Sequence, residues 1–197
     1  MKASPWAFLG LPQAPVPEAE GAKYGACRAE LDGKRLVLRM AKTTPTKIGQ
    51  FVTVWKRPHP DAEIAPLDEA DPVDAVIIAV GDDARHGFFV FSRPVLIERG
   101  VMSRAGAGGK RALRVYPPWC VPESAQALRT QRWQTRCFVA AGDQQGLEQL
   151  CRSGQVGGDF EIVDFWHGGS IREAHLVEFG KNIRCSSSDS ILLCGGD

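Results

Sequence analysis

Hydrophobic and polar residues alternate along several short stretches of this chain, a pattern typical of β-strands with one buried face. Two such stretches, residues 27–31 and 34–40, flank Asp32-Gly33, a dipeptide favoured in two-residue hairpin turns. We therefore expect a β-hairpin there. A third alternating stretch, residues 50–57, predicts another strand, and residues 41–49, which contain Thr, Pro and Gly, are expected to form a loop.

Further strands are predicted in the second third of the chain. Residues 75–80 form an apolar run without alternation, which is typical of a strand buried on both faces. Residues 87–92 predict a strand that Pro94 ends, and residues 111–116 predict the last one. The acidic, proline-bearing stretch 58–73 between them is expected to be a long loop.

Helical patterns come mainly late in the sequence. Residues 95–100 predict a short helical turn, and residues 122–140 a helix with proline at its first position. Asp143 is expected to cap a second helix, which would end at Gly154. Four or five central strands with a late helix indicate an α/β or α+β fold, in which a central mixed β-sheet is flanked by helices.

Composition excludes several classes of protein. The chain has 197 residues, of which 44% are hydrophobic and 24% charged, as in a globular domain. Its longest apolar run, residues 75–80, is far shorter than the ~20 residues that a membrane helix needs. The first residues do not resemble a signal peptide, and the six cysteines form no CxxC pair. These features favour a cytoplasmic protein with reduced thiols and no cofactor.

Charge is distributed unevenly along the chain. Residues 21–137 carry 19 Lys and Arg against 12 Asp and Glu, whereas residues 138–197 carry 4 against 9. Within the central block, residues 33–60 hold seven basic residues and no acid, and residues 61–83 hold eight acids and no base. Two basic segments separated by an acidic one are compatible with a one-sided positive face for an anionic partner, or with charges spread around the surface.

Three basic constellations are candidates for contacts with phosphate groups or bases. The first is the strand–loop–strand region 39–57, the second is the strand and proline corner 110–119, and the third is an arginine stripe on the predicted helix. Cations beside aromatic rings are typical of surfaces that bind single-stranded nucleic acid. The candidate residues are Arg39, Lys42, Thr44, Lys47, Lys56, Arg57, Lys110, Arg111, Arg114, Tyr116, Trp119, Arg129 and Arg132.

No catalytic site is evident in the sequence. Asp74 precedes a predicted buried strand and, with Asp82 and Asp83, is a weak candidate for a metal site. The following strand, which begins at Phe88, offers no carboxylate, and the four histidines have no zinc spacing. We therefore expect no metal site and a protein that is not an enzyme.

Long compound motifs resemble those of the MepB-like family. They are Tyr24-x-x-Cys27, Arg39-x-Ala41-Lys42-x-Thr44-Pro45-x-Lys47-x-Gly49-Gln50-Phe51-Val52-Thr53-x-Trp55-Lys56-Arg57, Gly109-Lys110-Arg111-x-x-Arg114-Val115-Tyr116-Pro117-Pro118-Trp119 and Gln126-Ala127-x-x-Thr130-Gln131-x-Trp133-Gln134. The resemblance covers a MepB-like domain over residues 21–141. The four prolines of residues 1–20 predict an irregular lead-in, and residues 142–197 are expected to be a C-terminal appendage, either a hairpin or poorly ordered chain. The resemblance also implies a fold similar to the PD-(D/E)XK nuclease core without the usual catalytic carboxylates.

The leading hypothesis is a non-catalytic protein that binds nucleic acid through a basic and aromatic face. Single-stranded DNA or RNA is expected over duplex, with weak sequence specificity, because no base-reading helix motif is present. Two alternatives stay open from the sequence. One is a metal-dependent nuclease with a displaced carboxylate site around Asp74, and the other is a regulatory module that binds a protein or an anionic metabolite.

Overall fold

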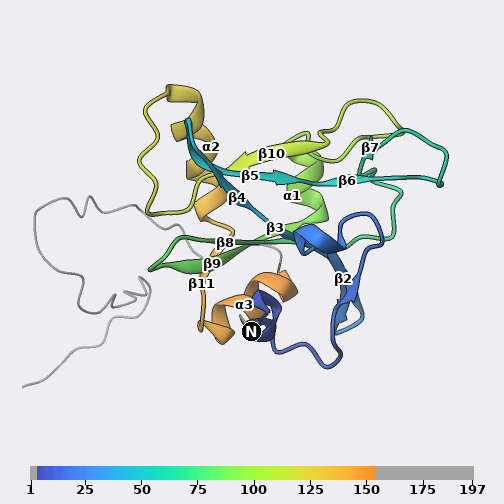
Figure 1. The fold of residues 1–197 in the computed structure, drawn as a ribbon, viewed down its shortest axis with the longest axis horizontal. Helices are drawn as coiled ribbons and strands as arrows, with labels where there is room; N and C mark the ends of the chain where they lie inside the picture. The colour runs from blue at the N-terminus through green and yellow to red at the C-terminus, as the bar shows by residue number, and fades with distance from the viewer. Residues whose placement is uncertain (1–3, 154–197) are drawn as a thin grey trace, which may run out of the picture. The chain divides into compact units, whose positions relative to one another are not determined.

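A six-stranded mixed β-sheet lies at the centre of the computed structural model, which describes residues 4–153 (Figure 1). Its strand order is β1-β2-β3-β8-β9-β11. Strands β3 and β8 are parallel, and the other neighbouring pairs are antiparallel. The strands are β1 (Val16–Pro17), β2 (Cys27–Leu31), β3 (Lys34–Met40), β8 (Ala75–Gly81), β9 (His86–Ser92) and β11 (Phe138–Ala140). The predicted α+β class with a central mixed sheet is confirmed.

The first hairpin has the predicted position and turn. Strands β2 and β3 are joined by Asp32 and Gly33, whose φ angles are 50° and 72°. Positive φ at both central residues is the requirement of a type I′ turn, which suits the right-handed twist of the strands. The apolar run 75–80 is buried at every position, so the prediction of a strand covered on both faces is also confirmed.

A second sheet packs on one face of the first. Its strand order is β10-β5-β4, and the strands are β4 (Lys42–Thr44), β5 (Lys47–Thr53) and β10 (Ala112–Val115). Two further short strands, β6 (Trp55–Lys56) and β7 (Ala65–Pro66), pair with each other as a separate two-stranded sheet. The expected loop over residues 41–49 was therefore wrong, because β4 and β5 form a hairpin there. The polar residues of β4 lie at the open edge of the sheet, so they give no burial pattern that the sequence could show.

Three α-helices and two 3-10 helices complete the described part. They are η1 (Pro5–Leu9), η2 (Ala22–Tyr24), α1 (Arg93–Glu98), α2 (Ala125–Thr135) and α3 (Gln144–Ser153). The helix expected over residues 122–140 is shorter, because residues 138–140 instead pair with the outer edge of β9 as β11. Asp143 caps α3 as predicted, since its carboxylate accepts a hydrogen bond from the Gly146 N–H at 2.9 Å.

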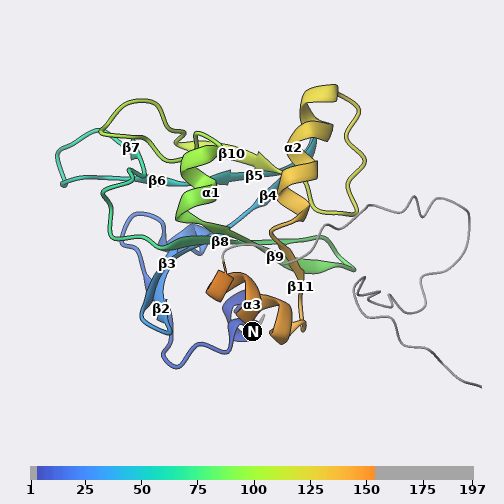
Figure 2. The same cartoon turned by 180° about the vertical axis from the view of Figure 1, so that it is seen from behind.

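The core has two layers, one on each face of the six-stranded sheet. Helices α1 and α2 and the second sheet cover one face, and η1 and α3 cover the other (Figures 1 and 2). Alternate residues of a strand serve alternate layers, so Val37 contacts the first layer while Leu36 and Leu38 contact the second. The lead-in takes part in the second layer, where Trp6 and Leu9 are buried.

Two further observations concern the helices and the cysteines of the described residues. Among residues 4–153, no helix has the length and apolar character that crossing a membrane would need. The four cysteines in this range are free thiols, three of them buried, and burial raises the pKa of Cys137 to about 11. The expectation of an appended hairpin or poorly ordered chain beyond Gly154 lies outside the described residues.

Candidate functional site

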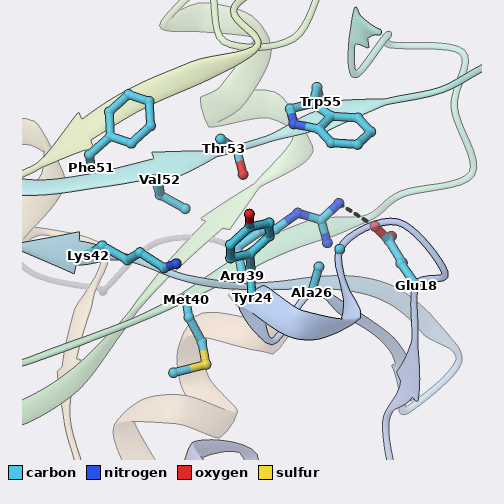
Figure 3. Close-up of a pocket in the computed structure, with 11 residues that line it drawn as sticks. Glu18, Tyr24, Ala26, Arg39, Met40, Lys42, Phe51, Val52, Thr53 and Trp55 are labelled. Atoms are coloured by element: carbon cyan, nitrogen blue, oxygen red, sulfur yellow. Dashed lines mark hydrogen bonds and ion pairs between the residues drawn. The ribbon is translucent and has the colours of Figure 1, made fainter.

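A pocket of about 250 Å³ opens where η2 and the ends of β3 and β4 meet β5 and β6 (Figure 3). Three aromatic residues line it, each from a different element: Tyr24 from η2, Phe51 from β5 and Trp55 from β6. Tyr24 is 50% exposed and Phe51 40% exposed. Exposing an aromatic ring to water is unfavourable, so a cluster of partly exposed rings marks a candidate binding site.

Arg39 is the most buried charged group of this pocket, with 4% of its surface exposed. It shares a face of β3 with Val37 and thus lies under the second sheet. Its guanidinium donates to a Glu18 carboxylate oxygen at 2.8 Å and to the Leu38 carbonyl at 3.0 Å. Burial lowers the pKa of Arg39, and the charge of Glu18 opposes that effect. Glu18 also pairs with Arg28 at 2.9 Å, so one carboxylate faces two guanidinium groups.

The remaining polar groups of the pocket are hydrogen-bond donors or can act as donors. The ammonium of Lys42 lies 4.1 Å from the centre of the Tyr24 ring, a cation–π distance. The Thr53 hydroxyl extends from β5 toward the side on which Tyr24 and Arg39 lie (Figure 3). Glu18 accepts from Arg39 through Oε2, while its Oε1 lies near Arg28 without a hydrogen bond and is buried. The groups that the pocket exposes to a ligand are therefore mainly positive charge and donors.

Lys42 lines this pocket, and three further exposed cations lie at or beside the ends of β5. We call these four residues, Lys42, Lys47, Lys110 and Arg111, the basic rim. None of them forms an ion pair with a residue of the range 4–153. Lys47 begins β5 at one end. At the other end the Arg111 carbonyl accepts the Val54 N–H at 2.9 Å, which brings residues 110 and 111 beside the β5–β6 junction. The basic rim therefore lies along strand β5, which contributes Phe51 to the pocket.

Other predicted cations are engaged in holding the fold. Lys56 pairs with Asp71, and Arg57 pairs with Glu20 and donates to the Ala62 carbonyl. Arg114 donates to the Thr44 hydroxyl at 3.1 Å and to the carbonyl oxygen of Gly49 at 3.0 Å, so it clamps the β4–β5 turn. Arg39 belongs with this group because Glu18 holds it. Contacts of these residues with an outside anion would compete with internal ones.

The two predicted stacking residues lie against other parts of the protein. Trp119 packs edge-on against Phe138, with ring centres 5.6 Å apart, and the guanidinium of Arg85 lies 5.3 Å from its ring. Tyr116 lies against the backbone at Gly49, where a Cβ atom would come within 2.7 Å of its ring. The φ of +79° at Gly49 also favours glycine. Both rings are only partly exposed.

The arginine stripe of α2 forms a separate patch. Arg129 and Arg132 are exposed and, within the described residues, form no ion pair. Helix α2 contacts the free edge of β10 through Gln134, which donates to the Arg114 carbonyl at 3.0 Å and accepts from the Tyr116 N–H at 2.9 Å. The stripe thus lies beyond the edge of the second sheet and outside the pocket lining.

The acidic candidates do not gather at one place. Asp74 precedes β8 and Asp82 follows it, so the two lie at opposite ends of this seven-residue strand. Hydrogen bonds from Arg35 are the main cause that lowers the pKa of Asp74, and Arg93 contacts the same carboxylate at 3.3 Å. Asp82 pairs with Arg85, which lowers its pKa to about 2. Across residues 4–153 no three His, Cys, Asp or Glu side chains are placed to share a metal ion.

Sequence reasoning did not single out Tyr24, Phe51, Thr53 and Glu18 as site residues. Tyr24, Phe51 and Thr53 belong to the motifs quoted above, but the exposure of a tyrosine or phenylalanine cannot be read from a motif. Glu18 lies in the lead-in, 21 residues before Arg39, and reaches it because β1 pairs with β2. A signal in the sequence that could have pointed to Tyr24, Phe51 and Thr53 is that these residues belong to motifs rich in basic residues, such as Lys42 and Lys47.

Comparisons with known proteins agree with this architecture. A solved structure described as the crystal structure of MepB is 32% identical, with a TM-score of 0.62, over 66% of this chain and 87% of that chain. No curated protein sequence matches the chain. The MepB-like family model matches residues 18–140, which hold the pocket and the basic rim. This chain therefore belongs to the MepB-like family.

Proposed function

We propose that this protein binds single-stranded nucleic acid, without cleaving it, on the face formed by the pocket and the basic rim. The observation that carries the proposal is the arrangement along β5, where exposed cations without an ion pair to residues 4–153 lie at or beside the strand whose Phe51 lines the pocket together with Tyr24 and Trp55. Cations neutralise phosphates, and aromatic rings stack on unpaired bases. Such a combination binds many sequences, because every base has a face that can stack.

A single strand fits this face better than a duplex. In a duplex the base faces are covered by their neighbours, so rings such as Tyr24 and Trp55 would find nothing to stack on. Across the described residues the one longer helix with an exposed arginine stripe is α2, and it lies outside the pocket. Weak sequence specificity follows, because phosphate contacts and stacking carry little information about base identity.

The test is fluorescence anisotropy of labelled single-stranded DNA, single-stranded RNA and duplex DNA over a series of salt concentrations. We expect the single strands to bind more tightly than the duplex and affinity to fall steeply with salt. The Lys110→Ala/Arg111→Ala variant is expected to lower the slope of log affinity against log salt by about 0.7 for each phosphate that is no longer neutralised.

The control variant removes a positive charge on a different part of the protein. Arg152 is exposed on α3, which covers the opposite face of the six-stranded sheet. Arg152→Ala should leave both affinity and slope unchanged. Absence of binding at low salt, or equal slopes in the rim variant and the wild type, would contradict the proposal.

A second candidate function has one specific observation in its favour. Arg39 at the pocket shares the carboxylate of Glu18 with Arg28, so two guanidinium groups face one carboxylate, and this excess of positive charge suits a small anionic metabolite. Calorimetric titration with nucleoside monophosphates tests it, and saturable binding of these without binding of oligonucleotides would favour this candidate. The nuclease alternative gains no support from Asp74, whose carboxylate is occupied by Arg35 and Arg93.

A further inference from the structure

We propose that the pocket receives one unpaired base at a time and favours a base with carbonyl oxygens, such as thymine or uracil, over adenine. This inference rests on the proposed function and adds to it the part of the ligand that enters the pocket. It assigns the phosphates to the basic rim and the base to the group formed by Tyr24, Trp55 and Thr53 (Figure 3).

The size of the pocket sets the first limit. A cavity of about 150 Å³ holds a benzene ring, so about 250 Å³ accommodates a one- or two-ring heterocycle with some freedom. A base pair is about twice as wide and cannot enter. The base must therefore be unpaired and turned away from its neighbours, as in a flexible single strand or at the end of a chain.

Aromatic surface supplies the contact with the face of the base. Tyr24 is half exposed and comes from the short helix η2, while Trp55 borders the pocket from β6. The ammonium of Lys42 lies over the Tyr24 ring, 4.1 Å from its centre. A base that stacks on this ring takes the place of the ammonium, and Lys42 then has a phosphate of the same nucleotide within reach of its long side chain.

Donor groups decide which bases suit the pocket. Lys42 has N–H donors and no acceptor, and the Thr53 hydroxyl can donate. Arg39 adds positive charge and N–H groups beyond those that it donates to Glu18 and to the Leu38 carbonyl. The acceptor in this set is Glu18, whose Oε2 accepts from Arg39 at 2.8 Å. Its Oε1 makes no hydrogen bond but is buried, 2.9 Å from Arg28, and is not exposed to a ligand. Thymine and uracil each present two carbonyl oxygens to such donors, whereas adenine has no carbonyl and presents ring nitrogens and an amino group. A donor-rich pocket therefore favours the first pair.

The test compares oligothymidylate with an abasic strand of equal length, which keeps the phosphates and lacks the bases. We expect the wild type to bind oligothymidylate about tenfold more tightly, because stacking of a base on an aromatic ring is worth about that much or more. Tyr24→Ala should remove most of this difference and leave affinity for the abasic strand unchanged. Leu128→Ala, which truncates an exposed side chain on α2, should change neither.

A second variant tests base preference. Thr53→Val keeps the shape of an exposed, β-branched strand residue and removes its hydroxyl. It should lower the ratio of the affinity for oligothymidylate to the affinity for oligoadenylate, by about threefold if one hydrogen bond is lost. Because oligoadenylate also stacks on itself, the change in the ratio is the readout rather than the ratio of the wild type. An unchanged ratio would overturn the preference for carbonyl-bearing bases.

The outcomes separate this inference from the proposed function. If neither strand binds at low salt, the proposed function fails. If both strands bind equally and Tyr24→Ala has no effect, binding runs through phosphates alone, and the single-base pocket is wrong while the proposed function stands. A difference that Tyr24→Ala abolishes, with an unchanged salt slope, supports the pocket.

Discussion

At the scale of single residues, two buried glutamines hold the second sheet in place. Gln50 donates to the Gly81 carbonyl at 2.6 Å and accepts from the Gly81 N–H at 3.2 Å, so it joins β5 to the end of β8. Gln134 does the same for the free edge of β10 at Arg114 and Tyr116. A side-chain amide carries an NH2 donor next to a C=O acceptor. It can therefore pair with both a backbone carbonyl and a backbone N–H at an open sheet edge.

Substitution of Gln134 is expected to destabilise the protein. Gln134→Leu keeps a similar volume in a fully buried position but leaves a backbone N–H and a carbonyl without partners. Each unsatisfied group costs about 1–3 kcal/mol, so we expect a loss of about 2–4 kcal/mol in the free energy of unfolding, measured by urea denaturation. Gln126→Leu on the exposed side of α2 is the matched control. A loss below about 1 kcal/mol for Gln134→Leu would refute the role of this amide in covering the edge.

At the scale of elements, helix α3 shows how a distant strand can complete a helix end. The last carbonyls of a helix lack partners within the helix. In α3 the Lys34 ammonium, from the first residue of β3, donates to the carbonyl oxygens of Cys151 and Arg152. At the other end Asp143 caps the first turn. The helix thus has polar attachments at both ends in addition to Leu147 and Leu150 in the core.

Removal of the Lys34 ammonium should loosen the last turn of α3. Lys34→Met keeps the apolar stem and removes the donor and the positive charge, which favours a helix C-terminus. We expect the free energy of unfolding to fall by about 0.5–1.5 kcal/mol and amide hydrogen exchange to become faster in residues 149–152. Lys47→Met, at an exposed position without an ion pair in the described range, should leave exchange in α3 unchanged. Equal exchange in wild type and Lys34→Met would show that packing alone holds this turn.

At the scale of the whole molecule, ionised carboxylates attach loops to the strands. Asp68 accepts hydrogen bonds from the Ser103 hydroxyl and the Gly106 N–H, which hold the glycine-rich loop before β10. The bond from Ser103 is the main cause that lowers the pKa of Asp68 to about 2, and Arg85 lowers that of Asp82 to about 2. Both values lie below the ordinary value of 3.8.

These shifts predict a loss of stability in acid. Above about pH 5 both carboxylates are ionised in the folded and the unfolded chain, and their contribution is complete. Between about pH 5 and pH 2 the unfolded chain binds protons first, so the free energy of unfolding falls. We expect the urea midpoint to decrease over this range and Asp68→Asn to make the decrease shallower. A decrease of equal steepness in Asp68→Asn would contradict a contribution from this carboxylate.

The sequence by itself determined the elements whose signals are local. Asp32 and Gly33 accept positive φ, so they favour the first hairpin, and the short apolar run before Gly81, rich in β-branched residues, favours a buried strand. The motifs between Tyr24 and Gln134 were likewise sufficient to indicate the family. These features depend on residues that lie next to one another in the chain, and for that reason they can be read from it.

Only the tertiary structure decided which charges and rings are free. Lys110 and Lys56 have the same side chain and stand in similar motifs, yet Lys56 is held by Asp71 because β6 comes beside that loop, while Lys110 has no such neighbour among the described residues. In the same way, residues 138–140 form a strand because the edge of β9 offers its backbone partners. Availability for a ligand depends on neighbours that the fold brings from distant positions, and no local pattern encodes them.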